Sequence, residues 1–372
     1  MTTKKILIVG AGVSGATVAR LLSDYAVDNQ LHFDMTIIDK RSHVAGNCHT
    51  AISHGIMEHV YGPHIFHTDQ PEVFSFVKKF SNFYNYRHTV KAMHDGVYSL
   101  PINLLTICQV YGKELSPKQA IDLIGSVRLD IKQPQNFEEQ ALSMVGDELY
   151  KKFFKAYTER QWGVKATEIP AYILKRLPLR FNFDDSYFNH PVQAMPFDGY
   201  TAMVEKMLDA KGVKIKLQTD FDKKMLSHYD NIFYTGKLDE FYDFQYGDLP
   251  YRTLEFQKEF FSDTDYQGCA VMNNCSPKGD YTRITEYKYF LPDKLHKDTI
   301  IAHEYSKDAK RDDIPYYPVN LVSGNQILDK YQGLAKKEDK VIFLGRLGRF
   351  QYLDMDKAIL AAMECGKNFL QE

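Results

Sequence analysis

Three glycines near the start of the chain have the spacing of a phosphate-binding loop. Gly10, Gly12 and Gly15 follow the apolar run 6–9, and a helical apolar pattern begins directly after them. In such loops the first glycine permits a tight turn, the second lets backbone N–H groups approach a pyrophosphate, and the third lets helix and strand pack closely. A second apolar run ends on Asp39, whose carboxylate can accept hydrogen bonds from a ribose. The spacing predicts a dinucleotide site.

Two histidines in a glycine-proline loop, His64 and His67, are the next residues able to do chemistry. Their i, i+3 spacing could place two metal ligands together, but no cysteine or carboxylate cluster completes such a site. A structural role and a position beside a cofactor ring are the other interpretations. We therefore expect no metal. The sequence also lacks the motifs of serine hydrolases, zinc proteases and P-loop enzymes.

Four arginines lie beside aromatic or turn residues and could bind a second anion. A cleft for a diphosphate other than the cofactor's own would need two or three guanidinium groups with tyrosine hydroxyls between them. The runs 316–317 and 349–352 could supply such hydroxyls. The alternative is that the arginines are solvated surface charges and the tyrosines pack in the core, and residue types alone leave both open. The four are Arg176, Arg252, Arg283 and Arg346.

Composition bounds the class of protein. The 372 residues can hold two or three domains, and the net charge of −2 gives no reason to expect nucleic-acid binding. No apolar run approaches the roughly 18 residues that a membrane span needs, so we expect no membrane insertion. The five cysteines form no C-x-x-C pair, and their odd number favours reduced thiols and a cytoplasmic location.

The remaining sequence predicts that segments are inserted into the dinucleotide domain. We expect a hairpin over 86–100 around a type I′ turn at Asp95-Gly96, and helices from 102 to about 176. One of these helices would begin with a capping box of Asn136 and Glu139. Antiparallel strands are expected between about 250 and 305, including 281–290.

The C-terminal segment is expected to have the same order of strand, loop and helix as the first unit. A strand is expected at 341–345 and a helix from about 354 to 370. A dinucleotide domain that uses both ends of the chain is typical of flavoproteins. We therefore expect an α/β fold in which a Rossmann-like domain carries an inserted helical domain and an antiparallel β-sheet domain. The expected boundaries are 1–84, 194–243 and 316–372 for the Rossmann-like domain, 101–178 for the helical domain, and 85–100, 179–193 and 244–315 for the sheet domain.

A series of short motifs occurs in order along nearly the whole chain. They are the runs 10–15, 61–68, 99–103, 157–163, 174–178, 185–190, 268–273, 281–286, 314–318, 345–348 and 352–356. Together they closely resemble the motifs of bacterial UDP-galactopyranose mutases. One departure is Ala45, where that family usually has glycine, and we expect FAD binding to survive it.

The resemblance implies a bound FAD that must be reduced, although UDP-galactopyranose and UDP-galactofuranose interconvert with no net redox change. Ring contraction requires O5 to leave C1 and O4 to attack it, so C1 must be electrophilic while the sugar is open. N5 of the reduced flavin would displace UDP and form an iminium with C1, which is covalent catalysis with the nucleophile on the cofactor. Such an isomerase would supply galactofuranose for surface polysaccharide.

The resemblance also implies roles for individual residues. Arg176, Arg283 and His64 are the expected catalytic groups, with the arginines on the UDP diphosphate and His64 against the isoalloxazine. Phe153 and Tyr157 would flank the uracil, and a mobile loop ending near 178 would carry Arg176 over the substrate. The expected substrate-binding residues are Phe153, Tyr157, Thr158, Trp162, Arg176, Tyr187, Phe188, Asn273, Arg283, Tyr317 and Tyr352. The expected FAD-binding residues are Gly10, Gly12, Val13, Ser14, Gly15, Asp39, Lys40, Gly46, Asn47, His64, Arg252, Arg346, Tyr352, Asp354 and Met355.

Two other functions share the cofactor motifs. A flavin oxidoreductase of the amine-oxidase or desaturase type would show substrate-dependent flavin reduction or oxygen uptake, and it has no need of a second diphosphate clamp. A non-catalytic sensor of a nucleotide sugar or of FAD would bind without turnover. By resemblance we expect a homodimer whose other partners are the nucleotide sugar and an unidentified reductant.

Overall fold

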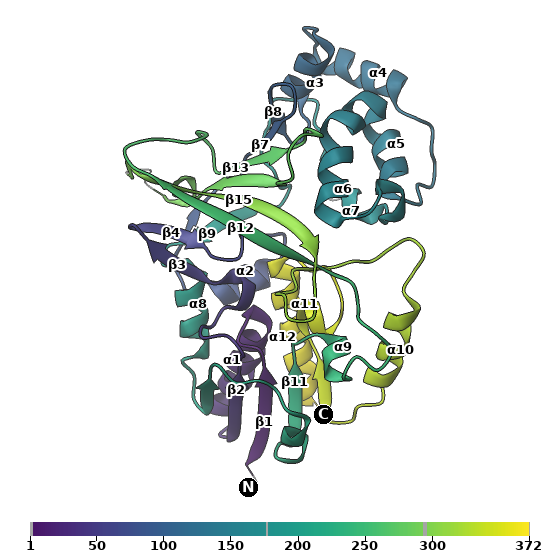
Figure 1. Cartoon of the computed structure of the whole chain (residues 1–372). Coiled ribbons are helices and arrows are strands. Elements are labelled where there is room, and N and C mark those ends of the chain that lie inside the picture. The colour runs from purple at the N-terminus through teal and green to yellow at the C-terminus, as the bar shows by residue number, and fades with distance from the viewer. Residues whose placement is uncertain (1–2, 176–177, 293–295, 372) are drawn as a thin grey trace.

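A parallel sheet of five strands forms one end of the protein in the computed structural model, which describes residues 3–175, 178–292 and 296–371 (Figure 1). Its neighbouring strands all run parallel, in the order β10-β2-β1-β11-β17. The first two strands and the helix between them form the expected β-α-β unit, while β17 comes from near the C-terminus. The strands are β1 (Lys4–Val9), β2 (Phe33–Ile38), β10 (Val213–Lys216), β11 (Asn231–Tyr234) and β17 (Val341–Phe343).

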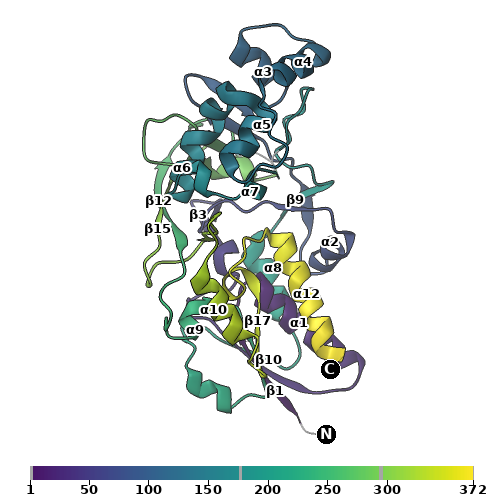
Figure 2. The same ribbon diagram turned by 90° about the vertical axis from the view of Figure 1, so that its right-hand side faces the viewer.

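Helices cover both faces of the parallel sheet. α1 (Val13–Asp28), α8 (Gly199–Leu208) and α12 (Met355–Gln371) lie on one face, and α9 (Leu238–Phe241) and α10 (Gln326–Ala335) lie on the other (Figure 2). Neighbouring residues of β1 face opposite cores, since Ile6 and Ile8 belong to the first and Leu7 to the second. All three side chains are fully buried, as a strand covered on both faces requires.

A second sheet of seven strands crosses above the parallel sheet in Figure 1. Its order is β16-β12-β15-β14-β13-β7-β8, and its neighbours are antiparallel except for β7 and β13. β12 and β15 are its two long strands, and residues 252–261 of β12 pair with the whole of β15. The strands are β7 (Val90–Met93), β8 (Val97–Leu100), β12 (Tyr251–Phe261), β13 (Val271–Asn274), β14 (Arg283–Glu286), β15 (Thr299–Asp308) and β16 (Tyr317–Pro318).

A group of helices extends beyond the antiparallel sheet at the far end of the molecule (Figure 1). Asn103, Ser116 and Asn136 cap α3, α4 and α5, because each side chain accepts a hydrogen bond from a backbone N–H in the first turn. α5 continues through a π-helical turn, Tyr150–Lys155, into α6 (Ala156–Trp162), which ends at Gly163 with φ +72°. The other helices are α3 (Leu104–Tyr111), α4 (Pro117–Val127), α5 (Phe137–Leu149) and α7 (Tyr172–Lys175).

Short elements connect these layers. β3 (Thr50–Ser53) and β4 (Ile56–His59) form a hairpin, and β5 (Phe66–Thr68), β9 (Val192–Pro196) and β6 (Phe83–Asn85) form a small antiparallel sheet. α2 (Pro71–Val77) and α11 (Gly345–Gly348) are short helices. The single-turn 3₁₀ helices are Gly46–Cys48, Ala166–Glu168, Lys223–Ser227 and Tyr287–Phe290.

Three local expectations are wrong in detail. The turn between β7 and β8 holds three residues, 94–96, and neither Asp95 nor Gly96 has the positive φ that a type I′ turn needs. The strand expected over 281–290 is only 283–286, because the chain turns into a 3₁₀ helix at Tyr287. The Glu139 side chain accepts from the N–H of Gln135 at 2.7 Å instead of from Asn136, so only half of the capping box forms.

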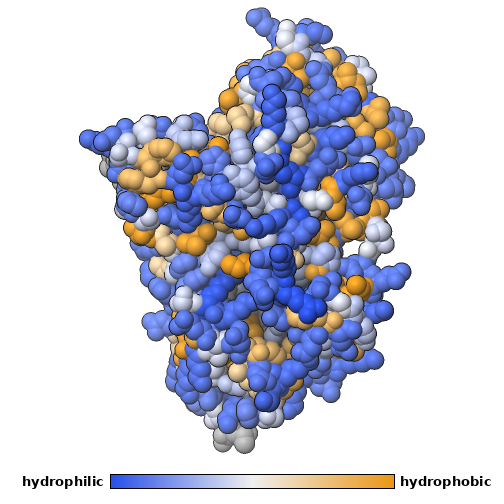
Figure 3. Space-filling model, in the orientation of Figure 1, coloured by the Kyte–Doolittle hydropathy of each residue, from blue (hydrophilic) through white to orange (hydrophobic). Residues whose placement is uncertain are grey.

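The surface mixes polar and apolar side chains on the face drawn in Figure 3. Within residues 3–175, 178–292 and 296–371, no helix is both long and apolar enough to cross a lipid bilayer.

Two glycines in the helical group give a matched test of backbone geometry. Gly146 breaks α5 with φ +79°, and a Cβ there would lie 2.8 Å from the Val127 carbonyl oxygen. Gly125 lies inside α4, and a Cβ there would meet no atom within 4 Å. We expect Gly146→Ala to lower the free energy of unfolding by about 1–3 kcal/mol. We expect Gly125→Ala to raise it by about 0.5–1 kcal/mol. Urea unfolding followed by circular dichroism measures both, and equal effects of the two substitutions would contradict the described break.

Candidate active site

A cavity of about 750 Å³ opens at the carboxyl ends of β1, β2 and β11. This is the edge at which parallel α/β sheets bind their ligands, and the volume is in the range of cofactor sites. Most of the residues expected to bind a dinucleotide line it. They are Gly10, Gly12, Val13, Ser14, Gly15, Asp39, Lys40, Gly46, Asn47, His64, Arg346 and Met355.

The glycine loop fits a dinucleotide for a steric reason. A Cβ on Gly15 would lie 2.0 Å from the Gly10 carbonyl oxygen, so Gly15 is needed for α1 to pack on β1. A Cβ on Gly12 would meet no protein atom closer than 3.8 Å, so this glycine leaves room for a ligand instead of for protein. The N-terminus of α1 therefore faces the cavity with its backbone accessible, as pyrophosphate binding requires.

Asp39 and Arg41 hold the second side of the same loop. The Asp39 carboxylate accepts hydrogen bonds from the backbone N–H groups of Ala11 and Arg41, both at 2.9 Å. It therefore fixes the glycine loop as well as facing the cavity. Arg41 also lines the cavity, and its Nη1 atom is buried with no hydrogen-bond partner among the described residues. An unpartnered guanidinium nitrogen beside the glycine loop fits an anionic ligand.

His64 enters the cavity with its ring fixed. Its Nδ1 lies 2.8 Å from the Gly62 carbonyl oxygen, and its backbone N–H donates to His59 Nδ1 at 3.1 Å. The contact with a carbonyl assigns the proton to Nδ1 and leaves Nε2 as an acceptor. Burial lowers the pKa of His64 to about 4, so the ring is neutral at pH 7.

Arg346 connects the cavity to a cluster of aromatic rings. Its guanidinium donates to the carbonyl oxygens of Tyr316 at 3.1 Å and Leu353 at 2.5 Å. It also lies 5.8 Å and 5.4 Å from the ring centroids of Tyr317 and Tyr352. These two rings stack on each other at 5.8 Å, and each lies 6.2 Å from Trp162 at the end of α6.

Beyond this cluster, three polar side chains form one row across the antiparallel sheet. The register places Arg283 of β14 opposite Asn273 of β13 on one side and Glu304 of β15 on the other. The Arg283 Nε lies 3.2 Å from a Glu304 carboxylate oxygen, and its Nη2 donates to the Tyr157 hydroxyl at 2.8 Å. Asn273 is 4% exposed, and its Oδ1 has no partner within the described part of the chain.

The charge of Arg283 is held in a largely buried environment, since its side chain is 21% exposed. Burial alone would lower the pKa of its guanidinium, but the Glu304 carboxylate and the neighbouring tyrosine hydroxyls together raise it. Burial raises the pKa of the Tyr157 and Tyr317 hydroxyls, so both stay protonated at neutral pH and can donate. The site therefore offers a permanent cation, hydroxyl donors and an unpaired amide oxygen beside the cofactor cavity.

Tyr187 approaches this row from the loop before β9, and Phe188 follows it in that loop. The Tyr187 ring meets His88 edge-on at 5.6 Å, and the Phe188 ring stacks on His67 at 3.7 Å. His67 Nδ1 lies 2.7 Å from His190 Nδ1, so this histidine pairs with another ring, which fits the structural role left open by the sequence. No group of three or more His, Cys, Asp or Glu side chains able to hold a metal ion occurs among the residues that the structure describes.

Several expected site residues lie elsewhere or in the wall of the site. Arg252 does not line the cofactor cavity: its Nε donates to the Gln161 carbonyl at 3.2 Å, and its Nη1 pairs with Asp308. Phe153 and Thr158 are almost fully buried, with Phe153 edge-on to Tyr98 at 5.2 Å. Asp354 precedes α12, and its backbone carbonyl oxygen accepts the N–H of Ala358 at 2.9 Å. Arg176, expected on the diphosphate, lies outside the described residues.

The sequence analysis missed Glu304, Arg41 and His88. Glu304 and Arg283 are 21 positions apart, and only the β14–β15 register brings them together. Arg41 follows Asp39 directly, and an arginine beside the acidic residue of a dinucleotide motif was an available signal. His88 is 4% exposed, and its Nδ1 lacks a partner in the described ranges, which no local pattern signals.

Comparisons with known proteins agree with this geometry. The family model of UDP-galactopyranose mutase matches residues 152–352, and that of the NAD(P)-binding Rossmann-like domain matches residues 8–80. The dTDP-fucopyranose mutase of Escherichia coli is 46% identical over 99% of this chain and 98% of its own length. The "Probable UDP-galactopyranose mutase" of Klebsiella pneumoniae is 47% identical over 100% of this chain and 96% of its own length.

Solved structures match over the whole chain. One of them is described as reduced UDP-galactopyranose mutase. Its match to this chain has a TM-score of 0.77 and 14% identity, and it spans 100% of this chain and 94% of the solved chain. Putrescine oxidase matches with a TM-score of 0.60 and 10% identity, which shows a shared fold.

A dinucleotide-binding α/β fold with a second, arginine-centred site beside its cofactor cavity defines an enzyme that acts on its substrate next to a bound nucleotide cofactor. The chain belongs to the UDP-galactopyranose mutase family, whose members are isomerases.

Proposed function

We propose that the protein interconverts UDP-galactopyranose and UDP-galactofuranose with reduced FAD as its cofactor. The observation that carries this proposal is the Asn273–Arg283–Glu304 row, which offers a largely buried guanidinium next to the aromatic cluster of Trp162, Tyr317 and Tyr352. An ordinary flavin oxidoreductase has no use for a second anion site in this place. A nucleotide sugar needs one for its diphosphate.

FAD fits the glycine-loop cavity. The N-terminus of α1, Asp39 and Arg41 would hold its pyrophosphate and ribose, and His64 and Arg346 would face the flavin end. When bound and reduced, the cofactor supplies the nucleophile that replaces UDP at the anomeric carbon. The neutral His64 ring, with Nε2 as an acceptor, would accept a hydrogen bond without adding charge.

The residues of the second site would bind and stabilise the leaving group. Arg283 would bind the diphosphate, with hydroxyls of Tyr157, Tyr317 and Tyr352 as further donors. Arg176 is proposed as the second arginine, and Phe153 and Tyr157 would flank the base. Asn273 would hydrogen-bond the sugar or the ribose through its Oδ1, which has no partner among the described residues. Closure of the segment that carries Arg176 would exclude water from the open sugar.

The division into domains also stays a proposal. A Rossmann-like unit, a helical unit and an antiparallel sheet unit with the boundaries given above would place the cofactor and the nucleotide sugar on different units. We further propose a cytoplasmic homodimer that is supplied with electrons by a separate reductant.

One relative gives a second candidate substrate. The E. coli relative is named for dTDP-fucopyranose, and its identity of 46% is close to the 47% of the K. pneumoniae relative named for UDP-galactopyranose. Both substrates have a diphosphate for Arg283 to bind. The assay below is therefore run with the dTDP-fucose nucleotide sugar as well as the UDP-galactose one. The larger kcat/KM identifies the substrate.

The redox state of the cofactor should control the reaction. We expect dithionite-reduced protein to convert UDP-galactofuranose to UDP-galactopyranose, and oxidised protein to be nearly inert, because only the reduced cofactor is nucleophilic. Chromatography of the nucleotide sugars measures the rate in both states. Equal rates in both states would overturn the proposal, and substrate-dependent oxygen uptake would favour the oxidoreductase instead.

Removal of the Arg283 side chain should slow the reduced enzyme strongly. Loss of a charge-assisted contact in a desolvated site should cost about 2–4 kcal/mol of transition-state stabilisation, or roughly 30- to 1000-fold in kcat/KM. The change is Arg283→Ala, with Arg283→Lys expected to recover only part of the loss because it lacks the planar fork. Arg311→Ala, which removes a guanidinium that is 57% exposed, is the control. Near-normal kcat/KM for Arg283→Ala would exclude the diphosphate role.

A further inference from the structure

Tyr187 and Phe188 belong to a loop with little regular structure of its own. Residues 178–191 contain no helix and no strand, apart from an isolated bridge between Ser186 and Thr89. Nevertheless, the two rings occupy defined places, edge-on to His88 and stacked on His67. Side-chain contacts must therefore hold the backbone of this loop.

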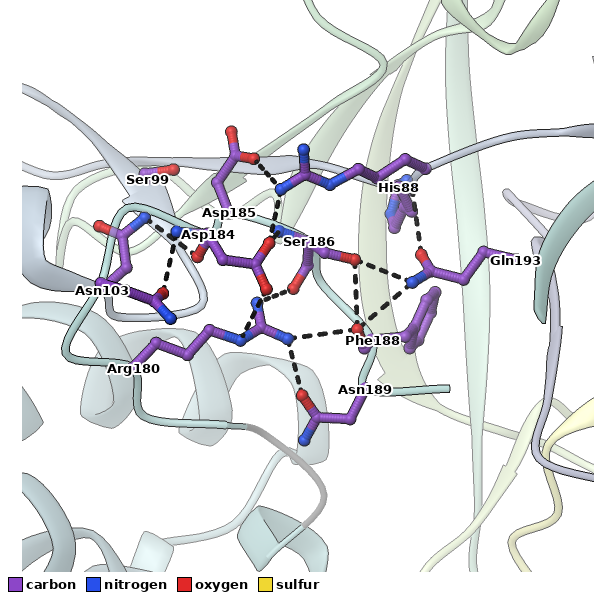
Figure 4. A network of polar contacts seen from close by, with 12 residues as sticks. His88, Ser99, Asn103, Arg180, Asp184, Asp185, Ser186, Phe188, Asn189 and Gln193 are labelled. Carbon is purple, nitrogen blue, oxygen red and sulfur yellow. Dashed lines mark hydrogen bonds and ion pairs between the residues drawn. The ribbon is translucent and has the colours of Figure 1, made fainter. Parts of the chain in front are cut away.

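Arg180 makes most of these contacts from within the loop itself (Figure 4). Its Nη1 donates to the Ser186 carbonyl oxygen, and its Nη2 donates to the Phe188 carbonyl oxygen at 3.2 Å. The same Nη2 donates to Asn189 Oδ1 at 2.7 Å, and its Nε lies 3.4 Å from Asp184. The side chain is 11% exposed, so these bonds form away from water.

The base of Arg180 is anchored to the helical group. Its backbone N–H donates to the Ile102 carbonyl at 3.0 Å, and the Leu104 N–H donates to the Asn182 carbonyl at 3.0 Å. Asn103, the N-cap of α3, donates to the Asp184 carbonyl at 3.4 Å. The Arg180 backbone is therefore fixed to the helical group, while its guanidinium binds the backbone of Ser186 and Phe188.

Gln193 holds the loop from its other end. Its Nε2 donates to Ser186 Oγ at 2.8 Å and to the Phe188 carbonyl at 3.3 Å, and its Oε1 accepts the His88 N–H at 3.3 Å (Figure 4). The Tyr187 N–H donates to the His88 carbonyl at 2.8 Å. Arg180 and Gln193 thus both donate to the Phe188 carbonyl oxygen. Two hydrogen bonds to the His88 backbone fix the position of the loop relative to His88.

We infer that Arg180 is a positioning residue that sets how the nucleotide sugar binds, by fixing the backbone that presents Tyr187 to the Arg283 site and seats Phe188 on His67. It acts through these two rings and not by contact with the substrate. One planar guanidinium donates to two backbone carbonyl oxygens and to the Asn189 amide oxygen. A lysine ammonium cannot donate to all three in the same geometry, so the guanidinium is essential. This inference rests on the proposed function.

The test compares Arg180→Lys with Arg87→Lys in the reduced holoenzyme. Arg87 pairs with the same Asp184 and with Asp185, but it is 57% exposed and binds none of the loop carbonyls. We expect Arg180→Lys to raise KM for the nucleotide sugar about tenfold while kcat stays within about threefold, the pattern of lost uniform binding. Arg87→Lys should leave both constants within about twofold of wild type.

Two further readouts do not depend on turnover. UDP quenching of the fluorescence of Trp162, the only Trp of the sequence, reports the dissociation constant, which should rise with KM. Hydrogen exchange of amides 184–190 should accelerate in Arg180→Lys and not in Arg87→Lys. If Arg180→Lys does not fold, Gln193→Met removes the second anchor of the same carbonyl and should shift KM in the same direction by about threefold.

The outcomes separate the two proposals. Unchanged KM in Arg180→Lys would overturn the inference, whether or not hydrogen exchange of amides 184–190 becomes faster. Faster exchange with unchanged KM would give Arg180 a structural role only. Equal losses in kcat and kcat/KM at constant KM would also overturn it. A wild-type reduced protein that turns over no nucleotide sugar would refute the proposed function, whereas wild-type turnover matched by Arg180→Lys would refute only the role of Arg180.

Discussion

The ion pair between Arg283 and Glu304 is the interaction on which the candidate site depends. Both residues come from neighbouring strands of the antiparallel sheet, and Glu304 is 2% exposed. A buried guanidinium without a partner would cost several kcal/mol. Because Glu304 holds one edge of the guanidinium and Tyr157 another, Arg283 keeps its charge although its side chain is only 21% exposed. Its proposed role is to donate guanidinium N–H groups to an anionic leaving group.

The fold places this charge beside a cofactor cavity by joining two sheets of different kinds. The parallel sheet forms the glycine-loop cavity at its carboxyl edge, and the antiparallel sheet crosses above it (Figure 1). Arg346 lines the cavity and also faces the rings of Tyr317 and Tyr352, so one side chain connects the cavity to the aromatic cluster. The aromatic cluster lies between the cavity and the Arg283 site, where the cofactor and the sugar would meet.

The cofactor half was predictable from sequence because its determinants are local. Gly10, Gly12 and Gly15 act within one turn, and Asp39 ends the next strand, so spacing alone defines the loop. The second site depends on strand register, which no short motif encodes. Glu304 therefore went unnoticed although Arg283 did not, and Arg252 was expected at the flavin but binds the end of α6. The turn at Asp95 and Gly96 is not the expected two-residue type I′ turn, because it contains a third residue, His94.

The central claim is that the anion site holds the departing UDP while the reduced cofactor bonds to the sugar in its place. Cyanoborohydride added during turnover of the reduced holoenzyme, followed by mass spectrometry of the released flavin, tests this claim most directly. The account predicts a flavin whose mass is increased by one sugar unit, formed with the reduced protein and absent with the oxidised protein. Unmodified flavin from a protein that is actively interconverting the two nucleotide sugars would contradict it.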